Sequence, residues 1–574
     1  MAALINALDN LSNMSIGENG HQEYSWSTNI EERIVQLNFQ LVRNANLVKL
    51  ENQFRGLLTD IFSCNDRSDK AKYITIICKL IAHTRDIIDG KGECKLTYMM
   101  IDCLYDFDEF LAFYLVTLIL NNDENNNSNI IQYGSWKDLK GFCAYVKEHN
   151  SQADEKHKLI DYCVVYANHC LRKDVNSNKP SLLAKWLPRE GSKYNWLFKL
   201  LARNYFTEYL ESAKIKGSND IKERAVKKAM MDYRKVCSQI NKVLDTTQVK
   251  QCGKQWSQIN PNKVTSITMN KQKKAFLNVK KDGSQRSKLE DRVKCAENFN
   301  EYIAKIVRGE VEAKGARIGI VDFVKSAYRL NPSCSAQLNE IQLLNAQWEN
   351  NSKQTGALGK FIAMVDVSGS MSGDPMDAAI GLGIRVAEKS SLGNRVMTFS
   401  ENPTWVNLDS ESESGFVNKV YKVHKADWGG NTNFYAALQL ILEAIKTAKM
   451  SAEEVEDMVL AVFSDMQIDQ ADNKFGSLYS NIEKLYAETG IAICGKPYKP
   501  PHILFWNLRH TGGFPNLTTQ ANTSMLSGFS PAMLNIFCEQ GIEGLQQFTP
   551  WSTLMTCLAN ERYTQIGDIV KEKY

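Results

Sequence analysis

The 574-residue sequence lacks the features that would place it in a membrane or in a common enzyme class. No stretch approaches roughly 18 uninterrupted apolar residues, and no basic segment followed by an apolar one opens the chain, so neither a membrane span nor a signal peptide is expected. The Gly-x-x-x-x-Gly-Lys-Ser/Thr, His-Glu-x-x-His and Gly-x-Ser-x-Gly motifs are absent, and only eight histidines are present. We therefore expect a cytoplasmic protein that is not an enzyme.

The sequence also lacks closely spaced pairs of cysteines, although the chain has 14 cysteines. Their spacing is irregular and includes no Cys-x-x-Cys pair, which favours reduced, buried thiols over disulfides or zinc ligands. The hydrophobic content of 43% and charged content of 23% are typical of a globular protein, and the length allows two or more domains.

The period of the apolar residues divides the chain into three ranges. Residues 1–25 are polar and are expected to form a loosely held arm. From 26 to 350, apolar residues recur at steps of three and four, which predicts an array of amphipathic helices. No strict repeat period is visible, so a regular solenoid and an irregular stack of helical hairpins both fit this range.

From 351 to 574 the pattern becomes that of an α/β domain. Strands are predicted at 361–366, 394–399, 404–408, 458–464, 502–507 and 523–527, with helices at 375–390, 433–449, 475–488 and 531–540. This alternation is the signature of a doubly wound parallel sheet, which binds ligands at the carboxyl ends of its strands. The predicted fold class is α + α/β.

A cluster of oxygen-bearing side chains follows the first of these strands. Asp366, Ser368 and Ser370 alternate along the turn after the strand, and alternating side chains can point at one ion. Asp465 follows a later strand, and Thr432 lies in a loop between them. Carboxylate and hydroxyl oxygens suit Mg²⁺ or Mn²⁺, so the sequence predicts a divalent cation site. A Ser/Gly turn without a metal is the alternative.

This order of residues resembles the metal-ion-dependent adhesion site of von Willebrand factor A domains, whose pattern is Asp-x-Ser-x-Ser, then Thr, then Asp. The match covers all five positions. The resemblance implies that Asp366, Ser368, Ser370 and Thr432 bind the ion directly or through water, while Asp465 supports them from farther away. It also implies that a protein partner presents a carboxylate to the open position on the metal.

Positive charge is concentrated in residues 221–290, which contain 17 lysines and arginines against 5 acids, although the net charge of the chain is only +4. Such a segment can bind phosphates and stack unpaired bases on aromatic rings. A solvated helical face balanced by acidic surface elsewhere is the alternative. The residues predicted to bind RNA are Lys227, Lys228, Arg234, Lys235, Lys271, Lys273, Lys274, Lys280, Lys281 and Trp256.

Four blocks in the helical range carry a second resemblance: residues 84–93, 133–139, 183–190, and 233–235 through 255–256. They resemble an uncharacterised intracellular family of plants, fungi and large DNA viruses that pairs a helical half with a von Willebrand A-like half. That family is similar to the TROVE module of the Ro autoantigen. The resemblance implies a ring of HEAT-like helical repeats closed by the A domain, with single-stranded RNA ends held in a basic hole.

Several residues of these blocks have two interpretations. Arg85, Lys91, Lys185 and Arg189 either face a lumen or pair with the acids beside them in the sequence. Trp136 and Trp186 are expected to be packing anchors between helices rather than platforms for bases, because large aromatic side chains usually serve burial.

Two functions follow from these observations. The first is non-catalytic capture of single-stranded or misfolded RNA by a ribonucleoprotein-type protein, with a Mg²⁺ site for a partner. The alternative is a protein-interaction scaffold, or a virion or assembly component, whose Mg²⁺ site binds acidic side chains. For a viral chain the virion is a second expected location, and the oligomeric state is left open.

Overall fold

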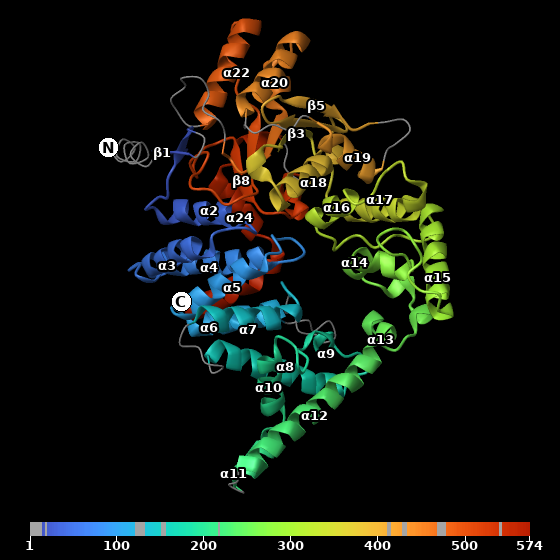
Figure 1. Ribbon diagram of the computed structural model, residues 1–574. Coiled ribbons are helices and arrows are strands. Elements are labelled where there is room, and N and C mark those ends of the chain that lie inside the picture. Colours follow the sequence, from blue (N-terminus) through green and yellow to red (C-terminus); the bar gives the residue numbers. More distant parts are fainter. Residues whose placement is uncertain are drawn as a thin grey trace. The chain divides into compact units, whose positions relative to one another are not determined.

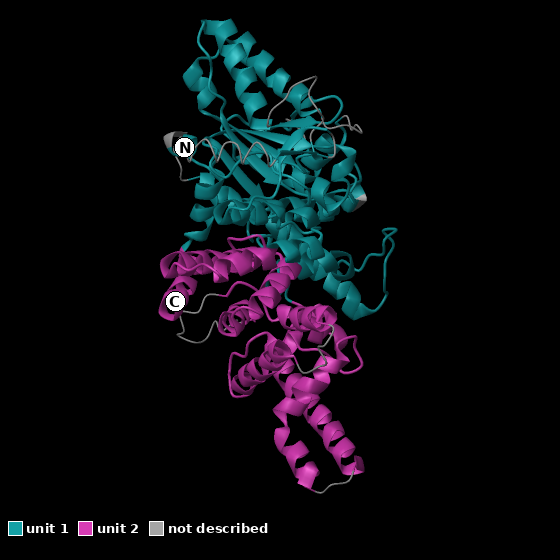
Figure 2. Ribbon diagram, turned by 90° about the vertical axis from the view of Figure 1, so that its left-hand side faces the viewer, with its two compact units in different colours: residues 1–53, 260–560 teal, residues 54–259, 561–574 magenta. Residues whose placement is uncertain are grey.

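In the computed structural model the chain forms two compact units (Figure 2). Unit 1 contains residues 1–53 and 260–560, and unit 2 contains residues 54–259 and 561–574. The structure describes residues 14–17, 20–120, 132–150, 157–215, 219–409, 415–426, 433–467, 478–538 and 542–574. The domain ranges 1–25, 26–350 and 351–574 stay predictions, because sequence periodicity and compactness are different criteria.

The centre of unit 1 is a six-stranded sheet (Figure 1). Its strands lie in the order β5-β4-β3-β6-β7-β8, and all pairs are parallel except β4 with the edge strand β5. The strands are β3 (Lys360–Asp366), β4 (Arg395–Phe399), β5 (Thr404–Asn407), β6 (Met458–Ser464), β7 (His502–Asn507) and β8 (Thr523–Ser527). The central strands are almost wholly apolar, as expected for strands buried on both faces.

Alternate residues of these strands form two separate cores. On β3, Phe361, Ala363 and Val365 belong to one core, while Ile362 and Met364 belong to the other. The first core includes residues of α16 (Ile320–Ala327), α17 (Leu338–Ser352), α18 (Asp374–Lys389) and α19 (Phe416–His424). The second includes residues of α2 (Ile30–Gln40), α20 (Phe434–Ala448) and α22 (Leu478–Cys494). Helices therefore cover both faces of the sheet, which makes it a doubly wound α/β fold.

Residues near the amino terminus are part of this unit. Strands β1 (Met14–Ile16) and β2 (Gln22–Tyr24) form a short antiparallel pair. Tyr24 exchanges two backbone hydrogen bonds with Phe514, each 3.0 Å long, and the ring of Trp26 packs edge-on against Phe514. The described part of the predicted arm is thus held by backbone pairing and aromatic packing.

The remaining elements of unit 1 are helical. They are α14 (Ser266–Phe276), α15 (Glu290–Val307), α21 (Ala452–Glu456), α23 (Ile542–Gln546), α24 (Pro550–Leu558) and the 3₁₀ turns η2 (Pro261–Lys263), η3 (Ser335–Gln337), η4 (Gly369–Met371) and η5 (Pro531–Phe537). The helix predicted at 531–540 is the 3₁₀ segment η5, which begins at a proline.

Unit 2 is built from helices. Helix α3 (Leu47–Phe62) ends in this unit. Its other elements are α4 (Arg67–Arg85), α5 (Cys94–Tyr105), α6 (Glu109–Leu120), α7 (Lys137–His149), α8 (Lys158–Val175), α9 (Leu183–Trp186), α10 (Asn195–Tyr205), α11 (Thr207–Ile215), α12 (Asn219–Leu244), α13 (Thr247–Cys252), η1 (Trp256–Gln258), η6 (Glu561–Tyr563) and α25 (Thr564–Lys573). Neighbouring helices pack on one another, and the last helix, α25, packs on α4.

Buried ion pairs join distant segments inside unit 2. Arg85 donates to both carboxylate oxygens of Asp138 over 3.0 and 2.6 Å, and the Tyr98 hydroxyl donates to the same carboxylate over 2.5 Å. Arg562 likewise donates hydrogen bonds to both carboxylate oxygens of Asp86, over 2.7 and 2.8 Å. These contacts connect the first two resembling blocks to each other and to the carboxyl terminus.

The fold class α + α/β is confirmed in its coarse form, with a helical amino-terminal region and a mixed carboxyl-terminal sheet of six strands. The sheet is mixed rather than wholly parallel because β5 pairs with β4 as a hairpin. HEAT-like repeats and a ring stay predictions. Among the described residues, no helix combines the length and apolarity needed to cross a membrane.

Candidate functional site

The predicted cation ligands lie where the sheet reverses its strand order. From β3 the chain continues to β4 on one side, and from β6 it continues to β7 on the other side. In open α/β sheets the crevice at such a switch point, outside the carboxyl ends of the strands, is the usual ligand site. Asp366 is the last residue of β3, and Asp465 directly follows β6.

Asp366 and the two serines form a compact group of oxygen donors. The Asp366 carboxylate is fully buried and accepts hydrogen bonds from the Ser368 backbone N–H over 2.9 Å and from the Ser464 hydroxyl over 2.5 Å. The hydroxyl oxygens of Ser368 and Ser370 lie 3.0 Å apart. Ser368 is buried, whereas Ser370 is exposed, so the group extends from the interior to the surface.

The loop after the serines leads directly into α18. Gly373 lies between them with φ of 93°, a left-handed backbone conformation that strongly favours glycine. Pro375 then occupies the first turn of α18, where the missing N–H costs no helical hydrogen bond. The sequence of this loop therefore fixes the path that carries the serines past the end of β3.

The two carboxylates of the site are balanced differently. Asp465 is fully buried, and it accepts a hydrogen bond from the Arg509 guanidinium over 3.0 Å and another from the Gln467 N–H over 3.1 Å. Asp366 has no lysine or arginine partner among the described residues. Burial, followed by the negative charge of Asp465, raises the pKa of Asp366 well above its ordinary range.

These residues fit a hard divalent cation. A buried carboxylate without a cationic partner, next to two hydroxyls and a second carboxylate, is an electrostatically costly arrangement that a bound cation would relieve. The donors are all oxygens, which is the set that Mg²⁺ and Mn²⁺ prefer. Asp366, Ser368 and Ser370 would hold such an ion, with Asp465 behind them.

The fifth predicted residue, Thr432, lies outside the described residues. The residue after it, Asn433, donates its backbone N–H to the carbonyl of Ser400 over 3.0 Å. Ser400 directly follows β4, the strand next to β3. Asn433 also caps the amino end of α20, where its side chain accepts a hydrogen bond from the Ala436 N–H.

A depression of about 340 Å³ opens beside Ser370. Arg509 and His510 line it after β7, and Asn44 and Asn46 line it from the loop that precedes α3. Burial, together with the positive charges of Lys49 and Arg509, lowers the pKa of His510. The surroundings of the depression are therefore electropositive and rich in hydrogen-bond donors.

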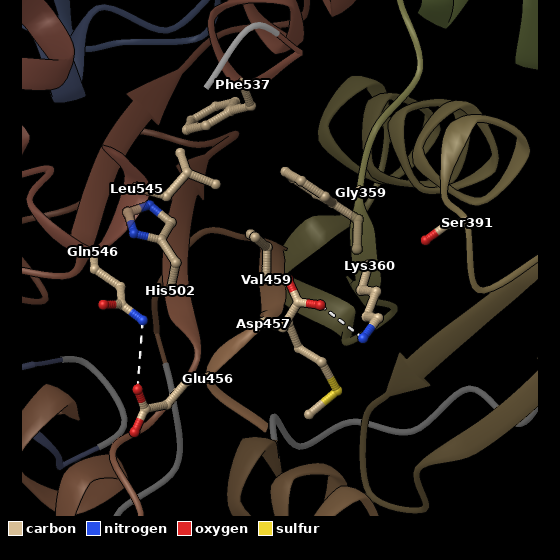
Figure 3. A pocket seen from close by; sticks show the side chains of 12 residues that line it. Gly359, Lys360, Ser391, Glu456, Asp457, Val459, His502, Phe537, Leu545 and Gln546 are labelled. Carbon is tan, nitrogen blue, oxygen red and sulfur yellow. Dashed lines mark hydrogen bonds and ion pairs between the residues drawn. The ribbon is translucent and has the colours of Figure 1, made fainter. Parts of the chain in front are cut away.

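A second cavity, of about 290 Å³, lies at the opposite edge of the sheet, where β3, β6 and β7 begin (Figure 3). Its charged side chains already have partners, since Lys360 and Asp457 form an ion pair of 2.7 Å and the Gln546 side chain donates to Glu456 over 3.5 Å. Burial lowers the pKa of His502 in its wall to about 4, so that imidazole is neutral. This cavity offers no excess charge to a ligand.

The predicted RNA-binding residues fall in both units. In unit 2, Lys227, Lys228, Arg234 and Lys235 lie exposed on α12, and Trp256 lies half-buried in η1. Arg234 forms an ion pair with Glu190 over 3.0 Å, and Lys235 forms one with Asp232 over 3.0 Å. The Lys228 ammonium lies 4.3 Å from the centre of the Tyr209 ring.

The other predicted residues lie in unit 1. Lys271 is exposed on α14, and Lys280 and Lys281 are exposed beyond it. Lys274 is half-buried. Lys273 is only 12% exposed and lies 3.9 Å from Glu340, and burial lowers the pKa of its ammonium. Within this unit, Lys273 therefore points into protein rather than toward solvent.

Several residues of the cation site could not be found from the motif. Ser464 and Arg509 contact the two aspartates, and Asn44 comes from a segment more than 300 residues earlier in the chain. Ser464 is the last residue of one predicted strand and Arg509 lies two residues after another, and those positions are the only signal that the sequence offers for them.

Comparison with known proteins shows two matches to family models. Residues 360–561 match a domain of unknown function (DUF7788), and residues 164–360 match another domain of unknown function (DUF2828). The first match begins at the first residue of β3 and ends where the chain leaves unit 1. It therefore encloses the sheet and the cation ligands.

An uncharacterized protein of Acanthamoeba polyphaga mimivirus is 28% identical over 570 residues, which cover 96% of this chain and 88% of that protein. The three matches fit an uncharacterised family that includes large DNA viruses. None of their descriptions names an activity, a ligand or a partner.

Proposed function

We propose that this protein is a non-catalytic binding protein whose unit 1 uses a Mg²⁺ or Mn²⁺ site to capture an acidic group of a protein partner. One observation carries this proposal: Asp366 and the hydroxyls of Ser368 and Ser370 come together at the switch point of the sheet, and no cationic side chain of the described ranges balances Asp366. The resemblance to the adhesion site of von Willebrand A domains supports the same function.

The charges of the site favour an anionic ligand. Because Arg509 balances Asp465, only the charge of Asp366 would offset that of a bound divalent ion. The ion supplies the remaining positive charge, which attracts a carboxylate. The Arg509 guanidinium and the side chains of Asn44 and Asn46 in the adjoining depression can donate hydrogen bonds to the same partner. A non-catalytic role rests on the absence of enzyme motifs from the sequence.

The proposal is tested by binding of a fluorescein-labelled ten-residue aspartate peptide to the full chain. We expect binding in Mg²⁺ that EDTA abolishes and that Asp366→Asn weakens at least 50-fold, since a lost charged ligand costs more than about 2 kcal/mol. Asp409→Asn is the matched control, because Asp409 is an exposed acid of the same unit that pairs with Arg395 over 2.9 Å. Equal binding in Mg²⁺ and EDTA would refute the proposal.

Capture of single-stranded RNA is a second candidate function. The exposed lysines of α12 and of the turn after α14 favour it, and so does the resemblance of the helical blocks to TROVE modules. The test compares structured RNA with and without a 3′ single-stranded tail, in Mg²⁺ and in EDTA, across a salt series. Tail-dependent binding that Lys227→Gln/Lys228→Gln or Lys271→Gln/Lys280→Gln/Lys281→Gln weakens would support it. Equal binding of duplex DNA or heparin would refute it.

The expected place of action is the cytoplasm, with the virion as the alternative for a viral chain. The similarity to a mimivirus protein makes the second location worth testing. Detection of the chain in purified particles, or only in infected cytoplasm, distinguishes the two.

A further inference from the structure

A cavity of about 700 Å³ in unit 2 is lined by positive charge. Four cationic residues contribute to its wall: Lys140 from α7, Lys185 from α9, Arg189 from the loop after α9, and Lys242 from α12. Among the described residues, none that lines the cavity is an aspartate or a glutamate, and none of these four cations forms an ion pair. The acid next to Arg189, Glu190, is paired with Arg234 instead.

The cations of this pocket act on one another. The pKa of Lys140 is lowered by burial and then by the positive charges of Arg189 and Lys137. Burial lowers the pKa of Lys185 as well. Cations brought together without acids create a positive potential, and a concave surface of that kind binds an anion.

Two aromatic rings stand among these cations. The Lys140 ammonium lies 5.5 Å from the centre of the Trp186 ring and 6.0 Å from that of Tyr194, and the Lys185 ammonium lies 5.6 Å from the Trp186 ring. The attraction between a cation and a ring at a partly exposed site is weaker than a hydrogen bond from lysine to a phosphate. A phosphate would therefore draw the ammonium groups away and leave the ring faces open for a base.

The wall that carries these groups is firmly built. The Asn241 side chain of α12 donates to the carbonyl of Ala184 in α9 over 2.9 Å. The Ser192 hydroxyl donates to the carbonyl of Arg189 over 2.7 Å, in a turn where Gly191 has φ of 75°. The backbone segments that carry Lys185, Trp186 and Arg189 are thus fixed before any ligand arrives, which lowers the entropic cost of binding.

We infer that this pocket binds one nucleotide, with its phosphate on the lysine and arginine side chains and its base against Trp186 or Tyr194. The volume suits a ligand of this size. The nucleotide is either free or part of a single strand. For a single strand, the inference rests on the second candidate function above and specifies where that strand is held. The inference is independent of the cation site in unit 1.

The test measures binding of adenosine 5′-monophosphate, adenosine, inorganic phosphate and a ten-nucleotide adenylate RNA to the full chain. Lys185→Gln/Arg189→Gln is expected to weaken binding of the monophosphate at least tenfold. Lys199→Gln/Arg203→Gln is the matched control, because it removes one lysine and one arginine from exposed positions on α10 outside the pocket, and it should change binding less than twofold. Thermal melts check that both variants are folded.

The probes separate the phosphate and base contributions. Trp186→Leu is expected to weaken binding of the monophosphate at least fivefold while leaving inorganic phosphate unchanged. The inference is overturned if the pocket variant binds like the control, if inorganic phosphate binds as tightly as the monophosphate, or if neither nucleotide probe binds. Binding of the ten-nucleotide RNA distinguishes a free nucleotide from a nucleotide that is part of a single strand. Loss of monophosphate binding with unchanged RNA binding assigns the pocket to free nucleotides, and loss of both assigns it to a strand.

Discussion

The candidate cation site of unit 1 and the cationic cavity of unit 2 differ in the sign of the charge that lacks a partner. In unit 2 the buried Asp86 and Asp138 are paired with Arg562 and Arg85, whereas no described aspartate or glutamate lines the cavity beside Trp186 that holds four cations. In unit 1 the reverse holds at the sheet edge, where the buried Asp366 has no cationic side chain within the described residues. Paired charges connect segments of the fold, and unpaired charges mark the places where a ligand of opposite sign would complete the balance.

The strongest way to break this comparison is to make the same substitution at a paired and at an unpaired aspartate. Asp138→Asn leaves Arg85 buried without a carboxylate, so we expect a loss of about 3–5 kcal/mol in the free energy of unfolding of unit 2. Urea unfolding followed by circular dichroism measures it. A loss below about 1 kcal/mol would show that the pair does not hold the helices together.

Buried histidines give both units the same dependence on acid. Burial, followed for His83 by the charge of Lys91, lowers the pKa of His83 in unit 2 to about 3, and burial lowers that of His502 in unit 1 to about 4. Both values lie below the ordinary 6.5 of the unfolded chain, which therefore binds more protons in acid. Each histidine should therefore contribute its whole share to the free energy of unfolding above pH 6.5. Below pH 6.5 that free energy should fall by about 1.4 kcal/mol per pH unit for each histidine as the pH drops toward 4.

Unfolding midpoints measured from pH 7.5 to pH 4 check this prediction. His502→Gln should make the unfolding midpoint of unit 1 depend less on pH, because the glutamine does not titrate. A slope that the substitution leaves unchanged would contradict the assignment of a neutral, buried imidazole.

Arg509 allows the same comparison inside unit 1, because it pairs with Asp465 while Asp366 has no cationic partner among the described residues. Arg509→Gln removes one positive charge from beside the cation site, so Mg²⁺ affinity should rise roughly fivefold, or about 1 kcal/mol, while capture of the aspartate peptide should fall. Calorimetric titration with Mg²⁺ and the peptide assay measure the two effects. A fall in both affinities would mean that Arg509 holds the site together instead of tuning its charge.

The smallest effect is expected at exposed ion pairs. Arg234 is 58% exposed where it meets Glu190, so Arg234→Gln should change the free energy of unfolding by less than about 0.5 kcal/mol. A loss above about 1 kcal/mol would place Arg234 among the structural pairs and remove it from the residues predicted to bind RNA.

The sequence predicted the strands of the sheet well, but it did not predict which side chains contact the two aspartates of the cation site. All six predicted strands agree with the structure to within one residue at each end. The central strands β3 and β6 were recognisable because strands buried on both faces are apolar runs. The motif also predicted that Asp366 and Asp465 would lie at strand ends, and the structure shows that these two strands, β3 and β6, are neighbours in the sheet. Pairing of Asp465 with Arg509 could not be predicted, because periodicity places residues on an element without naming the side chains opposite them.

The pocket of unit 2 shows the same limit. Lys185 and Arg189 had two interpretations in the sequence, and the structure places both in the wall of one cavity with Lys140 and Lys242. Trp136 is buried as expected, whereas Trp186 lines that cavity. Arg85 pairs with an acid, but the partner is Asp138, 53 residues away, and not a neighbour in its own block. Long-range partners of this kind depend on how the helices pack.

The most direct test of the account compares wild type and Asp366→Asn in urea unfolding, each in EDTA and in Mg²⁺. We expect Asp366→Asn to be at least as stable as wild type in EDTA, because it removes an unbalanced buried charge, and to gain nothing from Mg²⁺. Wild type should gain about 2.7 kcal/mol at a Mg²⁺ concentration 100 times the Kd. If Asp366→Asn is destabilised in EDTA as Asp138→Asn is, or if Mg²⁺ stabilises both proteins equally, Asp366 is a structural residue and the cation site does not exist.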